Sequence, residues 1–81
     1  MWNTTPAGLT RTFLFRDFNE AFAFMTQVAA VAEKQKHHPD WRNCWNKVEV
    51  TLCTHDQGNV ITESDHKLAA SIDEIYERFA P

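Results

Sequence analysis

The sequence predicts an α+β domain of two layers, in which a small antiparallel sheet of about four strands carries two helices on one face. Two stretches with alternating apolar residues indicate the strands, and two stretches with apolar residues three or four positions apart indicate the helices. Their order along the chain is strands, helix, strands, helix, which favours packing of both helices on one side. The 81 residues are expected to form one domain, residues 1–81, close to the lower size limit for a self-sufficient core.

The first predicted strand covers residues 9–15, where β-branched and aromatic side chains dominate. Leu9, Phe13 and Phe15 fall on one face of this strand, and the threonines between them fall on the other. Residues 2–5 are expected to form a short partner strand, because a proline and a glycine between the two stretches favour a turn.

The first helix is predicted over residues 18–36. Asp17 can cap its start and Glu20 stands at capping-box spacing, so both can accept bonds from free backbone N–H groups. Lysines near its end suit the negative end of the helix dipole, and Pro39 is expected to stop it. The residues predicted to form its buried stripe are Phe18, Phe22, Met25, Val28, Ala29 and Ala32.

This helix carries more apolar surface than one stripe. The additional residues are Ala21, Ala23, Phe24, Ala30 and Val31. A small domain cannot bury all of this surface alone, so we expect subunits to associate as a homodimer or homotetramer through the 18–36 helix and a sheet edge. The alternative is that the alanines merely favour helix formation and Phe24 is exposed.

The second half of the chain repeats the order of strand and helix. A turn or a strand break is expected at residues 43–47, followed by a strand at 48–54 and, after a polar loop, a helix. Thr62 with Asp65 three positions later marks the start of this helix, which is predicted to reach Ala80. The apolar residues facing the core are Val48, Val50 and Leu52 on the strand and Leu68, Ala69, Ile72, Ile75, Tyr76 and Phe79 on the helix.

Composition and charge exclude several functions. The net charge of −3 argues against non-specific nucleic-acid binding, which needs a basic surface. No secretory signal begins the chain and no stretch is apolar for long enough to span a membrane, so we expect a cytoplasmic protein, with the nucleus left open. Cys44 and Cys53 are accordingly expected to be free thiols.

The residues best suited to chemistry lie between Glu33 and Trp41. This stretch contains His37 and His38, and His55 follows the next predicted strand. The ordinary pKa of imidazole is about 6.5, so grouped histidines suit proton transfer near neutral pH. The structural alternative is that two histidines at a helix end only stabilise the negative end of its dipole.

Several spaced motifs occur together in an order that resembles one known family. They are Glu33-x-x-x-His37-His38-Pro39, then Trp41 and Trp45, His55 within Thr54-His55-Asp56, and Asp65 at the start of the last helix. The chain from Leu9 to Ala80 resembles the pterin-4a-carbinolamine dehydratases, also called 4a-hydroxytetrahydrobiopterin dehydratases. Members of that family usually begin with an additional helix, so this chain resembles a shortened version that lacks it.

The resemblance implies a hydro-lyase of tetrahydrobiopterin recycling, which removes water from a 4a-hydroxytetrahydropterin and gives the quinonoid dihydropterin. This elimination needs an acid to protonate the departing hydroxyl and a base to accept a proton from a ring nitrogen, and it requires no cofactor and no metal. By resemblance, His37 and His55 are the acid and the base, with their order left open. His38 would hold and orient the pterin.

Five further residues are expected to contact the substrate. Glu33 stands one helical turn before His37, hence on the same helical face, and would hydrogen-bond an imidazole, unless it is simply solvated. Trp41 would offer a flat wall to the pterin, unless it belongs to the core. Asp65 is ambiguous, because a carboxylate at this position stabilises its helix with no further role. Backbone groups of Cys53 and Thr54 would pair with the amide edge of the pterin.

Two other classes compete with this hypothesis. Glu33 and His37 have the spacing of a helical pair of zinc ligands, but adjacent histidines on a helix point in different directions and no second close ligand pair exists, so no metal site is expected. The second class is a non-enzymatic interaction module. Animal relatives resembling this family act as dimerisation cofactors of a homeodomain transcription factor through a helical surface, and the apolar first helix is compatible with such a role.

Overall fold

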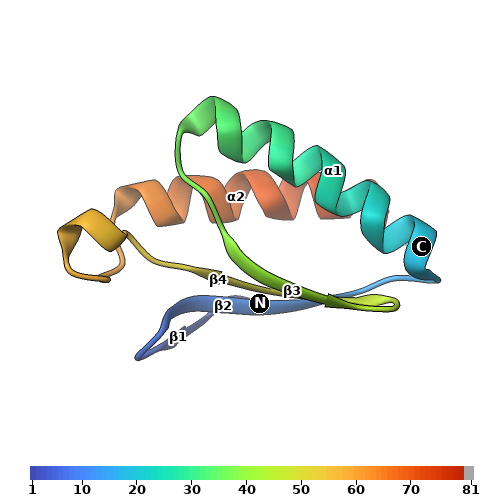
Figure 1. Ribbon diagram of the computed structural model, residues 1–81, viewed down its shortest axis with the longest axis horizontal. Coiled ribbons are helices and arrows are strands. Elements are labelled where there is room, and N and C mark those ends of the chain that lie inside the picture. Colours follow the sequence, from blue (N-terminus) through green and yellow to red (C-terminus); the bar gives the residue numbers. More distant parts are fainter. Residues whose placement is uncertain (80–81) are drawn as a thin grey trace.

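The computed structural model describes residues 1–79, which form one sheet and two α-helices. The strands are β1 (Asn3–Thr5), β2 (Gly8–Leu14), β3 (Asp40–Cys44) and β4 (Lys47–Leu52), and the helices are α1 (Phe18–Gln35) and α2 (Glu63–Glu77). The sheet is antiparallel in the order β1-β2-β4-β3, and both helices lie on one of its faces (Figure 1). The predicted fold class is confirmed, and the expected continuation of the last helix to Ala80 lies outside the described residues.

The core lies between the sheet and the helices, on the face that the alternating residues predict. Leu9 pairs with Leu52 and Phe13 pairs with Val48, so the apolar side chains of β2 and β4 share this face. The predicted partner strand also forms, because β1 pairs with the start of β2. None of the helices within residues 1–79 is both long and apolar enough to cross a membrane.

The buried stripe of α1 differs from the predicted one. The buried residues are Ala21, Phe24, Val28 and Ala32, and those predicted to be buried but found exposed are Phe18, Phe22 and Ala29. Both sets have helical spacing, so periodicity alone does not decide which set faces the sheet. Phe24 decides it, because its ring centroid lies 4.9 Å from those of both Phe13 and Phe15. The expectation of an exposed Phe24 is therefore wrong.

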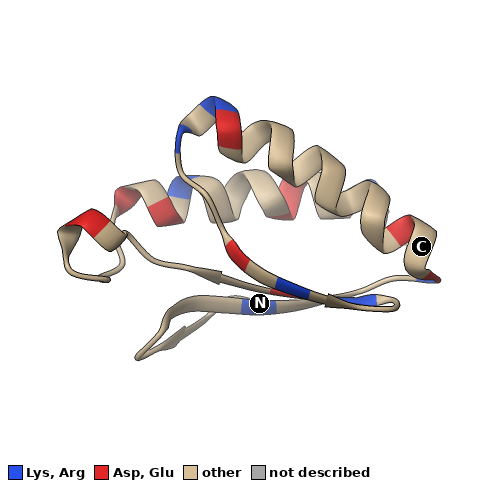
Figure 2. Ribbon diagram, viewed as in Figure 1, with Lys and Arg blue, Asp and Glu red and all other residues tan. Residues whose placement is uncertain are grey.

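An apolar surface nevertheless remains on α1. Phe18 and Phe22 are 49% and 55% exposed, and their ring centroids lie 5.8 Å apart. Between Glu20 and Glu33 the helix has no charged residue, and its middle is accordingly free of red and blue in Figure 2. An apolar surface on α1 thus exists. Ala23 and Ala30 of the expected set are exposed, whereas Ala21 and Phe24 are buried and Phe18 and Phe22 are exposed in their place.

The end of α1 is set by backbone conformation, before the proline that was predicted to stop it. Lys36 adopts a left-handed conformation with φ of 56°, and its N–H bonds to the carbonyls of Ala32 and Glu33. The N–H of His37 also bonds to Ala32, at 3.1 Å, which completes a typical helix stop. His37 consequently lies beyond the helix, so the prediction that Glu33 and His37 share a helical face is wrong.

Both helices begin at the predicted caps. Asp17 Oδ1 accepts a hydrogen bond from the N–H of Glu20 at 2.8 Å. At the start of α2, the N–H of Thr62 donates to Asp65 Oδ2, also at 2.8 Å. These bonds satisfy N–H groups that a helix start leaves free. The second cap is important for the site, because it fixes the position of the Asp65 carboxylate.

Candidate active site

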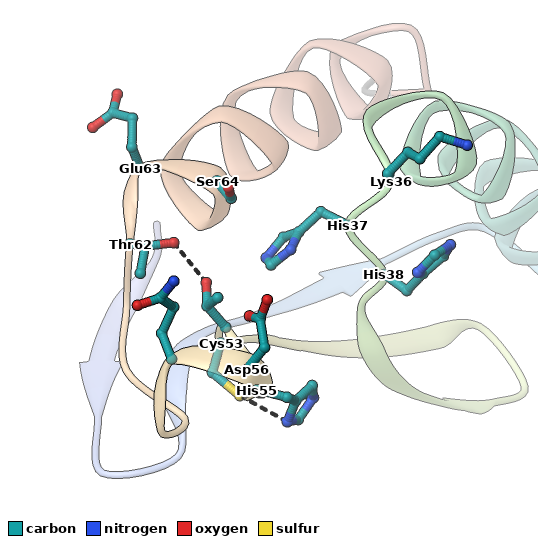
Figure 3. Close-up of a pocket in the computed structure, with 11 residues that line it drawn as sticks. Lys36, His37, His38, Cys53, His55, Asp56, Thr62, Glu63 and Ser64 are labelled. Atoms are coloured by element: carbon teal, nitrogen blue, oxygen red, sulfur yellow. Dashed lines mark hydrogen bonds between the residues drawn. The ribbon is translucent and has the colours of Figure 1, made fainter.

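A cavity of about 540 Å³ opens at the end of the molecule where α1 stops and α2 starts. Three segments line it: residues 36–38 after α1, residues 53–57 after β4, and residues 62–64 at the start of α2 (Figure 3). His37, His38 and His55 all belong to this lining. The structure therefore brings His55, which follows β4, to the same cavity as the adjacent pair His37 and His38, which follows α1.

The segment after β4 is held in place by a closed loop. The N–H of Thr54 bonds to the carbonyl of Val60 at 2.8 Å, which ties the two ends of the loop together. Between them His55–Gln57 form a short 3-10 turn that ends at Gly58, whose φ is 85°. This turn places His55 on the wall of the cavity opposite the end of α1 (Figure 3).

His37 is paired with a buried carboxylate. Its Nε2 lies 2.5 Å from Asp65 Oδ1, and the side chain of His37 is 14% exposed while that of Asp65 is fully buried. Asp65 Oδ2 accepts two further bonds, each of 2.8 Å, from the Thr54 hydroxyl and the Thr62 N–H. Asp65 therefore caps its helix, as the structural alternative expects, and also holds His37; its full burial leaves it no direct contact with the cavity.

The surroundings of Asp65 favour its ionised form. Burial alone would raise the pKa of the Asp65 carboxyl, because it penalises the charged form. The hydrogen bonds from His37, the Thr62 N–H and the Thr54 hydroxyl, together with the charge of His37, outweigh burial and hold the pKa of Asp65 below its ordinary value. An ionised Asp65 can only accept hydrogen bonds.

Acid is expected to remove the stabilisation that Asp65 provides. An aspartate in the unfolded chain has a pKa of about 3.9, and the folded-state pKa of Asp65 is lower. The unfolded state thus binds more protons here, so the stabilisation is complete above about pH 5 and is lost as pH falls through the folded-state pKa. Urea unfolding of the wild type and of Asp65→Asn across this range measures the effect. The difference between their free energies of unfolding is expected to shrink toward low pH, and a constant difference would contradict the assignment.

His38 and Glu33 form a second pair at the rim of the cavity. His38 Nε2 lies 2.9 Å from Glu33 Oε1, and the two side chains are 65% and 75% exposed. Glu33 does hydrogen-bond an imidazole, but the partner is His38 because α1 ends before His37. Water screens a pair this exposed, so it contributes little stability.

His55 is oriented by its own loop. Its Nδ1 lies 2.8 Å from the side-chain oxygen of Asn59, which stands in a left-handed backbone conformation with φ of 59°. An amide oxygen only accepts, so Nδ1–H donates and Nε2 is left without a proton in the neutral ring. Cys53 Sγ lies 3.8 and 3.9 Å from the two ring nitrogens of His55, so the thiol sits beside the ring.

The predicted site residues divide into three groups. Those that line the cavity are His37, His38, Cys53, Thr54 and His55. Asp65 lies beneath His37, and Glu33 reaches the site through His38. Trp41 is not among the lining residues of the described chain. It lies on β3, pairs with Val50 of β4 and packs against the core.

Sequence reasoning missed two contacts that shape the site. Thr62 is identified in the sequence only as a cap, but its Oγ1 also lies 2.6 Å from Thr54 Oγ1. Asn59 appears in the sequence only as part of a loop, and no local pattern indicates its bond to His55. Within residues 1–79, no group of three or more histidines, cysteines or acidic residues lies close enough together to hold a metal ion.

Fold and site together define a class of protein, a small α+β domain whose polar cavity presents imidazoles that can exchange protons with a bound ligand. The chain belongs to the pterin-4a-carbinolamine dehydratase family, whose sequence profile, described as "Pterin 4 alpha carbinolamine dehydratase", matches residues 1–75.

Bacterial relatives agree with this family. A protein of Afipia carboxidovorans is 56% identical in an alignment of 80 positions that covers 96% of this chain and 79% of the relative. A protein of Nitrobacter winogradskyi is 61% identical over 68 residues, which are 84% of this chain and 66% of the relative. Both carry the name "Putative pterin-4-alpha-carbinolamine dehydratase".

Two solved structures share the fold. A "transcriptional coactivator/pterin dehydratase" of Brucella melitensis has a TM-score of 0.87 and 45% identity, covering 93% of this chain and 81% of its own. A "pterin dehydratase-like protein" described as a RuBisCO assembly factor in the alpha-carboxysome has a TM-score of 0.74 and 25% identity, covering 94% of this chain and 87% of its own. Proteins of this fold are thus described with enzymatic and with assembly roles.

Proposed function

We propose that this protein is a hydro-lyase that removes water from a 4a-hydroxytetrahydropterin and gives the quinonoid dihydropterin. In this reaction the bond between C4a and the hydroxyl oxygen breaks while an acid protonates the oxygen, and a base takes the proton of the neighbouring ring nitrogen. The observation that carries the proposal is the presence of His37, His38 and His55 around one cavity of about 540 Å³. This volume falls within the usual range of small-molecule sites.

The hydrogen bonds of two histidines suggest which atoms do the chemistry. His37 uses Nε2 to bond Asp65, and His55 uses Nδ1 to bond Asn59. The other nitrogen of each ring, Nδ1 of His37 and Nε2 of His55, is then available to exchange a proton with the pterin. The two rings stand on different walls of the cavity, so one would serve as acid and the other as base. These two nitrogens carry no proton in the neutral rings, so the ring that acts as acid must start as the imidazolium and the ring that acts as base must start neutral. The face of the pterin that carries the hydroxyl decides their order.

The remaining site residues would bind or position. We propose that His38, oriented by Glu33, holds the pterin at the rim, and that backbone groups of Cys53 pair with its amide edge. The backbone of Thr54 is already bonded within its loop, because its N–H donates to Val60 and its carbonyl accepts from Gln57 and Asn59. Asp65 is fully buried, so it would act on the substrate only through His37. Trp41 does not line the cavity and is left out of the proposed site.

A direct assay tests this proposal. The breakdown of 4a-hydroxytetrahydropterin is followed with and without the purified protein. The protein is expected to accelerate the breakdown in proportion to its concentration. A rate equal to that of the uncatalysed reaction at every protein concentration would overturn the proposal.

An interaction module is the second candidate, and the exposed surface of α1 favours it. Phe18 and Phe22 present an apolar pair that this chain does not bury. This surface, with a sheet edge, would support a homodimer or homotetramer, or a protein partner as the description of the Brucella melitensis relative suggests. An adaptor alone would give no pterin turnover, so the same assay separates the two functions, and particle size in solution tests self-association.

A further inference from the structure

The Thr54 hydroxyl is buried between two polar groups. Thr54 is 8% exposed, and its Oγ1 lies 2.8 Å from Asp65 Oδ2 and 2.6 Å from Thr62 Oγ1. The hydroxyl therefore makes two short hydrogen bonds, one to the carboxylate that holds His37 and one to the residue that begins α2. Both bonds are made to groups of the protein itself, so the single hydroxyl proton of Thr54 is already used.

The proton positions along this network follow from the ionised state of Asp65. A carboxylate can only accept, so the Thr54 hydroxyl gives its single proton to Asp65 Oδ2. Thr54 Oγ1 must then accept from Thr62, whose hydroxyl is the donor in that pair. By the same reasoning, Nε2 of His37 carries the proton that bonds Asp65 Oδ1. Every contact in the network thus has one direction only.

We propose that Thr54 is a positioning residue for His37, because the juxtaposition of Thr62, Thr54, Asp65 and His37 forms one directed chain of hydrogen bonds. This series of hydrogen bonds runs from the Thr62 hydroxyl through Thr54 to Asp65. Asp65 in turn holds His37 with a proton on Nε2 and none on Nδ1 in the neutral ring. Within residues 1–79, Nδ1 of His37 has no hydrogen-bond partner, so it is the ring nitrogen free for a ligand. The expected effect of Thr54 on the reaction rate rests on the proposed dehydration activity. The expected tautomer of His37 does not depend on that activity.

The first part of the test is spectroscopic. Nitrogen NMR of the histidine side chains reports which ring nitrogen carries the proton in the wild type. In the neutral ring of His37, the proton is expected on Nε2. A neutral ring protonated on Nδ1 would overturn the proposal, whatever the behaviour of any variant.

The second part compares matched variants. Thr54→Val keeps the shape of the side chain but removes the hydroxyl, and we expect a mixture of His37 tautomers with dehydration slowed by about tenfold. Thr54→Ser restores the hydroxyl and is expected to recover the wild-type tautomer and rate. Thr51 lies on the open face of the sheet and serves as the control threonine. Thr51→Val is expected to change neither the tautomer of His37 nor the dehydration rate.

The outcomes separate this proposal from the proposed function. If Thr54→Val folds and keeps the wild-type tautomer and rate, Thr54 does not position His37. A serine variant as impaired as the valine variant would also overturn the proposal, because packing rather than the hydroxyl would then be responsible. If the wild type failed to accelerate dehydration, the proposed function would fall, while the NMR signals would still decide whether Thr54 holds His37.

Discussion

Replacing both His37 and His55 with alanine is expected to slow dehydration of 4a-hydroxytetrahydropterin by at least about a thousandfold, close to the uncatalysed rate. A positioned acid or base contributes about a hundredfold to ten-thousandfold, and the double variant removes both. His38 would remain at the rim, so pterin binding is expected to weaken less than turnover. Steady-state assays that separate kcat from KM measure this difference.

The chain contains its own control for this experiment. His66 is the fourth histidine, and it is exposed on α2 outside the cavity lining. His66→Ala is expected to retain the wild-type kcat. Circular dichroism of each variant checks that the fold is intact. Full activity in a folded His37→Ala/His55→Ala variant would exclude the proposed chemistry.

Replacing Gly8 with alanine is expected to destabilise the protein by roughly 4 kcal/mol, which is a large fraction of the stability of a small domain. Gly8 has φ of 131°, a conformation that residues with a Cβ rarely adopt. An added Cβ would also lie 2.2 Å from the carbonyl oxygen of Leu52 and 3.1 Å from Cβ of Cys53. Because backbone would have to move, β2 and β4 would separate where β4 leads into the cavity. Urea unfolding followed by circular dichroism measures the loss.

The other glycine provides the matched control. Gly58 also has a positive φ, of 85°, but an added Cβ would meet nothing within 4 Å. Gly58→Ala is expected to cost only about 1–2 kcal/mol, which is the penalty of the left-handed conformation alone. Equal losses in the two variants would show that the close approach of Gly8 to Leu52 is not what the fold requires.

The fold could be predicted because its signals are local. Alternation in β2 and β4 and the caps at Asp17 and Thr62 depend on neighbouring residues, and all of them form as expected. The orientation of α1 could not be predicted in the same way. Its two apolar stripes satisfy helical periodicity equally well, and the choice depends on the contact of Phe24 with Phe13 across the core.

In the candidate site, the sequence indicates the histidines but not their hydrogen-bond partners. The motifs indicated His37, His38 and His55, which do line one cavity. Their partners follow from the path of the backbone. Lys36 turns left-handed and ends α1, so Glu33 meets His38, while Asp65 from α2 meets His37 across the fold. Spacing along a helix cannot reveal a partner that another element supplies.

The imidazoles around the cavity are proposed to bind the pterin. NMR titration of the histidine side chains with an unreactive pterin tests this binding most directly. The signals of His37, His38 and His55 are expected to shift along one common saturation curve, while those of His66 stay in place. A pterin that left all three cavity histidines unchanged, or that bound with a shift of His66 alone, would contradict the claim.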